Sequence, residues 1–184
     1  MSTYRRAKTT GGTYFFTVVT FRRQHILCDD HVRAALREAI HAIRAVCPFT
    51  IDGLVLLPDH LHCIWTLPPD DADFGKRWAM IKRFVTKQCG PTLLRDEWLT
   101  DSKRRRNEST LWQRRFWEHT IRDETDYLRH MEYLHYNPVK HGLVKSVKDW
   151  QFSTFHRYVK EGVYPEDWGG RGDEEAGENF GEPV

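Results

Sequence analysis

Residues 50–67 contain two strand-like runs that are separated by only Pro58 and Asp59. Both runs are rich in apolar side chains, and a connection of two residues joins neighbouring strands that run in opposite directions. The segment therefore predicts an antiparallel hairpin with strands over 50–57 and 60–67. Because alternate residues of a strand share a face, the second strand has an apolar face and a face that carries His60 and His62.

The rest of the chain alternates between strand and helix patterns. Strands are predicted over residues 13–21 and 111–119, and helices over 30–46, 74–88 and 124–137. Gly90-Pro91 is expected to end the second helix, and Pro138 together with Gly142 the third. Residues 150–159 are expected to form a short element. Residues 91–110 read as irregular, with a mobile basic loop over 103–106. The order βαββαβα with an antiparallel sheet predicts a ferredoxin-like α+β sandwich.

Charge is distributed unevenly along the 184 residues, although the net charge is only +2. Residues 76–115 hold twelve Lys/Arg against four Asp/Glu, a formal +8, whereas residues 161–184 hold eight Asp/Glu against one Arg, a formal −7. The sequence thus predicts one basic folded domain over residues 1–160. An acidic, glycine-rich and flexible tail is expected over 161–184.

The cysteines at positions 28, 47, 63 and 89 are far apart and form no Cys-x-x-Cys pair. This spacing argues against a disulfide framework or a cysteine zinc site, and favours a reducing compartment. No apolar run follows Arg5 and Arg6, and none approaches the length of a membrane span. We therefore expect no signal peptide and no membrane partner.

His60 and His62 lie two residues apart on one strand face, where two imidazoles can chelate a cation. Taken alone, the pair is also compatible with two histidines that have no special role. Asp59 can orient one ring from behind, or simply cap the turn. The histidine pair is therefore a weak signal by itself.

Tyr133 and Asn137 are four residues apart, so a helix places both on one face. Each has an ordinary explanation, since tyrosine is common at the edge of a core and Asn before Pro is a frequent helix stop. Of the neighbouring tyrosines, Tyr136 points about 100° away from Asn137, and Tyr127 lies about 15 Å back along the helix. Only Tyr133 shares the Asn137 face.

Three stretches in this order resemble a known family. They read Leu-Pro-Asp-His-Leu-His at 57–62, Leu-Trp-Gln-Arg-Arg-Phe-Trp-Glu-His-Thr-Ile-Arg-Asp-Glu at 111–124, and Tyr-Leu-His-Tyr-Asn-Pro-Val-Lys-His-Gly-Leu-Val at 133–144. The chain is similar over residues 10–159 to the REP-associated tyrosine transposases, which belong to the single-tyrosine His-hydrophobic-His transposases. The resemblance implies a cytoplasmic, nucleoid-associated enzyme that acts on single-stranded or hairpin DNA with palindromic repeats.

The resemblance also implies roles for particular residues. His60, His62 and Asn137 match the metal site, and Tyr133 matches the nucleophile that forms a 5′-phosphotyrosine by transesterification. Two imidazoles alone would favour zinc or another late transition metal, whereas the family implies Mg²⁺ or Mn²⁺. A phenol has an ordinary pKa of about 10, so its deprotonation needs assistance. His135, Lys140 and metal-bound water are all open as candidates.

Basic and aromatic side chains suggest a DNA-binding surface. The aromatic residues Trp112, Phe116 and Trp117 could stack on unpaired bases, although core packing is an alternative for them. A charge run can also be an ordinary solvated face. The predicted DNA-binding residues are Lys82, Arg83, Lys87, Lys103, Arg104, Arg105, Arg106, Trp112, Arg114, Arg115 and Arg122.

Two other functions remain open from the sequence. A domesticated relative would hold repeat hairpins without cutting them, and a replication initiator or relaxase would share the histidine pair and the tyrosine. The length of 184 residues, with no helicase region in the sequence, counts against the second. A monomer and a homodimer are both compatible with the sequence.

Overall fold

The computed structural model describes residues 9–169 and contains a four-stranded antiparallel sheet with the order β2-β3-β1-β4. Every pair of neighbouring strands is antiparallel. The α+β, ferredoxin-like prediction is confirmed. The strands are β1 (Thr13–Val19), β2 (Thr50–Leu56), β3 (His60–Thr66) and β4 (Trp117–Thr120).

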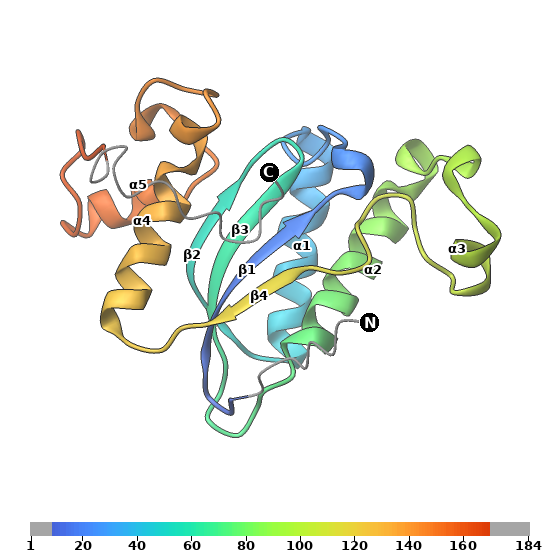
Figure 1. Ribbon diagram of the computed structural model, residues 1–184, viewed down its shortest axis with the longest axis horizontal. Coiled ribbons are helices and arrows are strands. Elements are labelled where there is room, and N and C mark those ends of the chain that lie inside the picture. The colour runs from blue at the N-terminus through green and yellow to red at the C-terminus, as the bar shows by residue number, and fades with distance from the viewer. Residues whose placement is uncertain (1–8, 170–184) are drawn as a thin grey trace, which may run out of the picture.

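Helices cover both faces of the sheet (Figure 1). Two of them, α1 and α2, pack on one face, and α4 packs on the other. The helices are α1 (Asp30–Val46), α2 (Phe74–Leu93), α3 (Asp101–Arg105), α4 (Glu124–Lys140) and α5 (Phe155–Lys160). Short 3₁₀ turns cover Phe21–Arg23, Asp96–Trp98 and Val147–Asp149.

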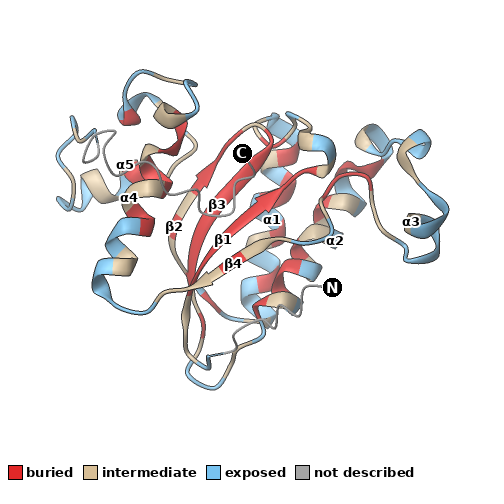
Figure 2. Cartoon of the chain, in the orientation of Figure 1, coloured by how far each residue is buried: buried red, intermediate tan, exposed pale blue. Residues whose placement is uncertain are grey.

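The alternation of side chains along β3 divides the interior into two clusters. Leu61, Cys63 and Trp65 face α1 and α2, where Trp65 stacks on Trp78 with ring centroids 4.2 Å apart. Ile64 faces the opposite way and packs with residues of α4. Figure 2 shows that the central strands are buried along most of their length, whereas α3 is exposed. The predicted division of β3 into an apolar face and a histidine face is thus correct.

The predicted end of the second helix at Gly90-Pro91 is wrong, because α2 continues to Leu93. Pro91 lies in the last turn, where its missing N–H removes only one helical hydrogen bond. The helix ends instead where Leu94 N donates to Gly90 O at 2.9 Å.

Residues 91–110 are more regular than the sequence suggested. Thr100 caps α3 by accepting a hydrogen bond from Lys103 N, so the basic run lies in a short helix rather than in a loop. The fourth strand is shorter than predicted. Trp117 pairs with Thr17 and Gln113 N donates to Val19 O, so a step of four residues lies against a step of two in β1. This bulge places Phe116 among Phe16, Phe74 and Trp78.

The helix α4 also runs past its predicted end, through Pro138 to Lys140. Leu143 N then donates to Pro138 O, and Gly142 N donates to Val139 O, both at 2.9 Å. These two bonds form a Schellman motif, and Gly142 has the positive φ of +67° that the motif requires. Of the two predicted stop signals, Gly142 is therefore confirmed as the one that ends the helix, and Pro138 is not.

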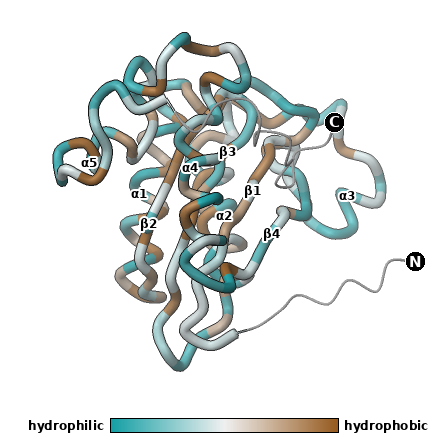
Figure 3. Tube along the Cα trace, turned by 60° about the vertical axis from the view of Figure 1, so that its left-hand side comes forward, coloured by the Kyte–Doolittle hydropathy of each residue, from teal (hydrophilic) through white to brown (hydrophobic). Residues whose placement is uncertain are grey.

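The start of the predicted tail packs against the domain. Tyr164 and Trp168 contact the ring of Phe155, with centroids 5.8 and 5.9 Å away. Residues 170–184, most of the predicted tail, lie outside the described residues. Figure 3 shows hydrophobic residues along the strands and mostly hydrophilic ones near α3. Among the described residues, no helix is long and apolar enough to cross a membrane.

Candidate active site

The sheet holds His60 and His62 through their Nδ1 atoms. His60 Nδ1 lies 2.7 Å from Asp59 Oδ1, and His62 Nδ1 lies 2.9 Å from the hydroxyl of Thr17, its neighbour across β1. Both side chains are buried, and their ring centroids are 4.9 Å apart. Nε2 is therefore the nitrogen that each ring can offer to a metal.

Asp59 sets the proton position on His60. Burial by itself would raise the pKa of Asp59, but the hydrogen bonds and charges of His60 and Arg23 outweigh it and lower the pKa to about 2. An ionised carboxylate can only accept hydrogen bonds, so the facing Nδ1 carries the hydrogen and Nε2 carries the lone pair. Of the two roles considered for Asp59, orientation of the ring is the one supported by this geometry.

The α4 helix docks on the histidine face because small and apolar residues meet there. Met131 and Leu134 pack with Phe15 and Ile64. Gly53 in β2 allows this close approach, since a Cβ at that position would lie only 2.8 Å from Met131 Sδ. The docking brings one face of α4 against the two histidines.

Tyr133 is the tyrosine that this docking places beside the histidine pair. Its ring meets that of His62 edge-on, with centroids 5.4 Å apart. Its hydroxyl accepts a hydrogen bond from Lys140 Nζ at 3.1 Å, and the ammonium also lies 4.6 Å from the centre of the ring. Asn137 is fully buried one helical turn later. The structure thus brings together the two sequence motifs that lie 70 residues apart.

His141 is a neighbour of the site that the sequence analysis missed. Its ring centroid lies 5.2 Å from that of His60, and its side chain is exposed. The available signal was its spacing, because His141 follows Asn137 by four residues and so continues the same helical face.

Comparisons with known proteins decide the family. A REP-associated tyrosine transposase of Escherichia coli (strain K12) is 47% identical over 171 residues, which are 92% of this chain and 92% of that protein. The chain belongs to the REP-associated tyrosine transposases. A Haemophilus influenzae (strain ATCC 51907 / DSM 11121 / KW20 / Rd) protein named as a candidate member of the same family is 44% identical over 176 residues, covering 94% of this chain and 96% of that protein.

A solved structure extends the likeness to three dimensions. It is a REP-associated tyrosine transposase bound to a REP hairpin, and it is 47% identical with a TM-score of 0.79. The match covers 97% of this chain and 98% of that one. No family model matches the chain.

In this REP-associated tyrosine transposase, only one of the two residues suggested to assist Tyr133 lies near it. His135 packs on the other side of α4 against Phe155 and Tyr158, and its Nε2 lies 3.1 Å from the hydroxyl of Thr154. Burial, followed by the charges of Arg157 and His156, lowers the pKa of His135 to about 3. Lys140, in contrast, contacts the phenol directly.

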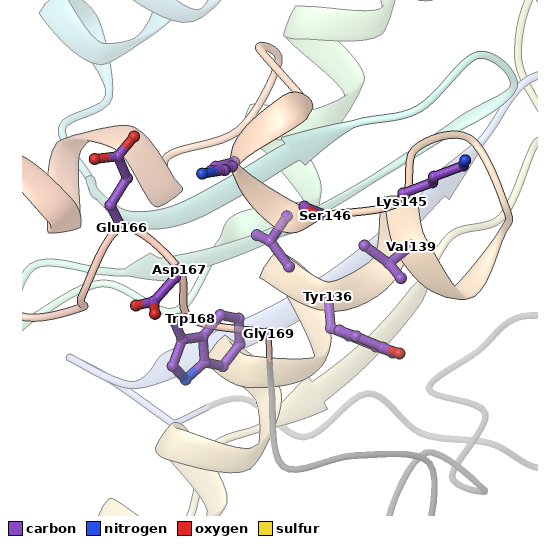
Figure 4. A pocket seen from close by; sticks show the side chains of 10 residues that line it. Tyr136, Val139, Lys145, Ser146, Glu166, Asp167, Trp168 and Gly169 are labelled. Atoms are coloured by element: carbon purple, nitrogen blue, oxygen red, sulfur yellow. The ribbon is translucent and has the colours of Figure 1, made fainter.

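A cavity of about 270 Å³ lies beside the same C-terminal end of α4, but on another side of the helix. Tyr136 and Trp168 line it together with Lys145 and Asp167 (Figure 4). None of the predicted catalytic or metal-site residues lines this cavity. The outward position of Tyr136 agrees with its exclusion as a partner of Asn137.

A second group of possible metal ligands lies at the junction of β4 and α4. The ligand atoms of His119, Asp126 and His130 all lie within 4.8 Å of one another, which is compatible with a divalent metal. Asp126 Oδ2 lies 2.8 Å from His119 Nε2, and Asp126 Oδ1 lies 3.1 Å from His130 Nδ1. The two rings stack in nearly parallel planes, 14° apart, so their in-plane lone pairs do not converge on one point. The geometry instead favours a structural role, in which the Asp126 carboxylate joins α4 to His119 of β4.

The predicted DNA-binding residues are in two kinds of surroundings. Lys82 Nζ donates to Gln113 O at 2.9 Å, and Trp112 is only 6% exposed, so both side chains make contacts within the protein. Lys103 Nζ lies 3.9 Å from the centre of the Phe21 ring. The remaining predicted residues are exposed: Arg83, Lys87, Arg104, Arg105, Arg106, Arg114, Arg115 and Arg122.

Glu108 offsets part of this charge. Its carboxylate lies 3.4 Å from Arg114, 3.7 Å from Lys103 and 3.8 Å from Arg106. Arg106 and Arg114 are more than half exposed, and ion pairs of this length with exposed side chains contribute little to stability. The arginines can therefore exchange this partner for a phosphate at small cost.

Proposed function

We propose that this chain cleaves and rejoins single-stranded or hairpin repeat DNA by transesterification at Tyr133. The contact between Tyr133 and His62, made by α4 against β3, is the observation that carries the proposal. The REP hairpin bound by the related protein supports the choice of substrate. DNA processing by a tyrosine transposase agrees with the family.

The donor set fits a divalent ion. His60 Nε2, His62 Nε2 and the buried Oδ1 of Asn137 would hold it, and we expect Mg²⁺ or Mn²⁺ because a carboxamide ligand and open positions suit a weakly held hard ion. A bound ion supplies Lewis-acid polarisation of the scissile phosphate. Thr17 and Asp59 keep the two rings in place for this role.

Tyr133 supplies the nucleophile. The bond from Tyr133 Oη to phosphorus forms as the bond from phosphorus to the 3′-oxygen breaks; the phenol proton passes to water, and the released 3′-oxygen takes a proton from water. Lys140 donates to Tyr133 Oη and so holds the attacking atom in place. Attack by a different 3′-hydroxyl reverses the step and joins new strands, so no nucleotide cofactor is consumed.

The exposed arginines of α3 and the following segment would bind DNA phosphates. Arg104, Arg105, Arg114 and Arg115 are the principal residues that we assign to this surface. Lys82 and Trp112 are left out of it, because the structure uses them for packing.

The test is covalent capture of a labelled palindromic-repeat hairpin on a denaturing gel. With Mn²⁺, the wild-type chain should yield a protein–DNA species, and EDTA should abolish it. Binding of the hairpin without any covalent species would instead support a domesticated DNA-binding protein. A covalent species that formed equally well after Tyr133→Phe would refute the proposed nucleophile.

A further inference from the structure

Arg23 reaches the metal-side histidines through Asp59. Arg23 Nη1 lies 2.8 Å from Asp59 Oδ2, while the other carboxylate oxygen, Oδ1, lies 2.7 Å from His60 Nδ1. The carboxylate is therefore held from both of its oxygens, by a guanidinium on one side and an imidazole on the other. Asp59 itself is 8% exposed, so few other groups can hold it.

The loop that carries Arg23 has an unusual backbone. Arg22 and Arg23 both lie in the left-handed region, with φ of 56° and 51°. Residues other than glycine rarely adopt this conformation, and it persists where the surroundings require it. Here the turn directs the Arg23 side chain back toward Asp59 at the start of β3, whereas Arg22 lies over Trp98 with its guanidinium 5.0 Å from the ring centre. The two arginines thus share a backbone conformation but contact different residues.

We propose that Arg23 is a positioning residue for the metal site: its guanidinium holds Asp59 against His60 and keeps His60 Nε2 turned toward the ion. This inference rests on the proposed function of His60 and His62. Arginine suits the role better than lysine, because its planar fork fixes the direction of the bond to a carboxylate. Loss of such an outer partner typically lowers metal affinity by about 10–100-fold.

The experiment measures Mn²⁺ binding to the full chain without DNA, by calorimetry or by the electron paramagnetic resonance of free Mn²⁺. Arg23→Ala should weaken binding by about 10–100-fold, and Arg23→Lys should recover part of the loss. Arg22→Ala is the matched control, since it removes the same charge from the same loop without touching Asp59. Alanine, like arginine, has a Cβ that disfavours a positive φ. Both variants therefore keep the same steric strain of the left-handed backbone at the substituted position. Circular dichroism melting verifies that each variant is folded.

A double-mutant cycle with Asp59→Ala separates positioning from a direct effect. If Arg23 acts through Asp59, the double variant should bind Mn²⁺ no more weakly than Asp59→Ala alone. Wild-type affinity in Arg23→Ala, or fully additive losses in the cycle, would overturn the inference. His60→Ala tests the underlying site: if it too binds Mn²⁺ as the wild type does, the proposed metal site fails, whereas loss in His60→Ala alone removes only the role of Arg23.

Discussion

The two sides of α4 carry the same kinds of side chain in opposite surroundings. Toward the sheet, Tyr133 lies beside His62 and its hydroxyl accepts from Lys140. Toward α5, burial lowers the pKa of His135 to about 3, and burial raises the pKa of Tyr164 to about 12. The Tyr133 hydroxyl thus has a charged partner, whereas the rings of Phe155 and Tyr164 lie around the buried His135. Residue type is therefore not enough to identify the chemistry; the side of the helix decides it.

Replacing a tyrosine by phenylalanine on each side of α4 should give the largest difference in covalent capture of the hairpin. Tyr133→Phe should lower covalent capture of the hairpin by about 10³-fold or more, as expected when a nucleophile is removed. Tyr136→Phe, three residues along the same helix and facing the cavity of Figure 4, should leave it at the wild-type level. Both variants should bind the hairpin equally in a gel-shift assay, because neither change removes a positive charge.

Loss of capture in both variants would indicate damage to α4 as a whole rather than loss of the nucleophile. Loss in Tyr136→Phe alone would place the chemistry on the wrong side of the helix and break the comparison.

The same side-dependence explains which parts of the site could be predicted. A strand and a helix each have a fixed period, so the sharing of faces by His60 with His62 and by Tyr133 with Asn137 followed from spacing. Docking of α4 on the histidine face depends on Gly53 and Met131, which are far apart in the sequence. Arg23 could not have been found by periodicity, because its contact with Asp59 arises from a left-handed turn.

Errors in the predicted fold have a common cause. Pro91 and Pro138 are predicted as helix ends, yet each helix continues for two residues beyond its proline. The strand prediction over 111–119 missed a bulge, because Phe116 packs with aromatic residues from two other elements, β1 and α2. Interior patterns such as those of α1 were predicted well, since seventeen residues of regular spacing outweigh any single residue.

Replacing a lysine on each side of α4 should give a difference of intermediate size in the rate of adduct formation. Lys140→Met should slow adduct formation by about 10–100-fold, because a hydrogen bond to a charged group contributes about 1.5–3 kcal/mol. Lys145→Met removes an equal charge from the cavity on the other side and should have little effect on the rate. Lys140→Arg should restore part of the activity if the charge and its hydrogen bond to Tyr133 are what matter.

The rate is measured in single-turnover time courses at saturating DNA, so that weaker binding cannot imitate a slower step. Equal rates for Lys140→Met and Lys145→Met would remove Lys140 from the mechanism while leaving Tyr133 in place.

The smallest expected effect is on the pH dependence of stability. It arises only on the side of α4 that faces α5, at His135. Well above pH 6.5 this imidazole is neutral in both the folded and the unfolded chain, so it contributes no pH dependence to stability there. As the pH falls from 6.5 toward about 3, the unfolded chain binds a proton that the folded chain excludes, and the free energy of unfolding declines by about 1.4 kcal/mol per pH unit. His135→Gln abolishes this loss.

The stability difference between the wild type and His135→Gln should therefore shift by about 2 kcal/mol in favour of the variant between pH 7 and pH 5. Urea denaturation at the two pH values measures the shift. Tyr164→Phe, which alters the same aromatic cluster without an acid-titrating group, should follow the slope of the wild type. If His135→Gln also followed that slope, burial of a neutral imidazole would not be the source of the acid sensitivity.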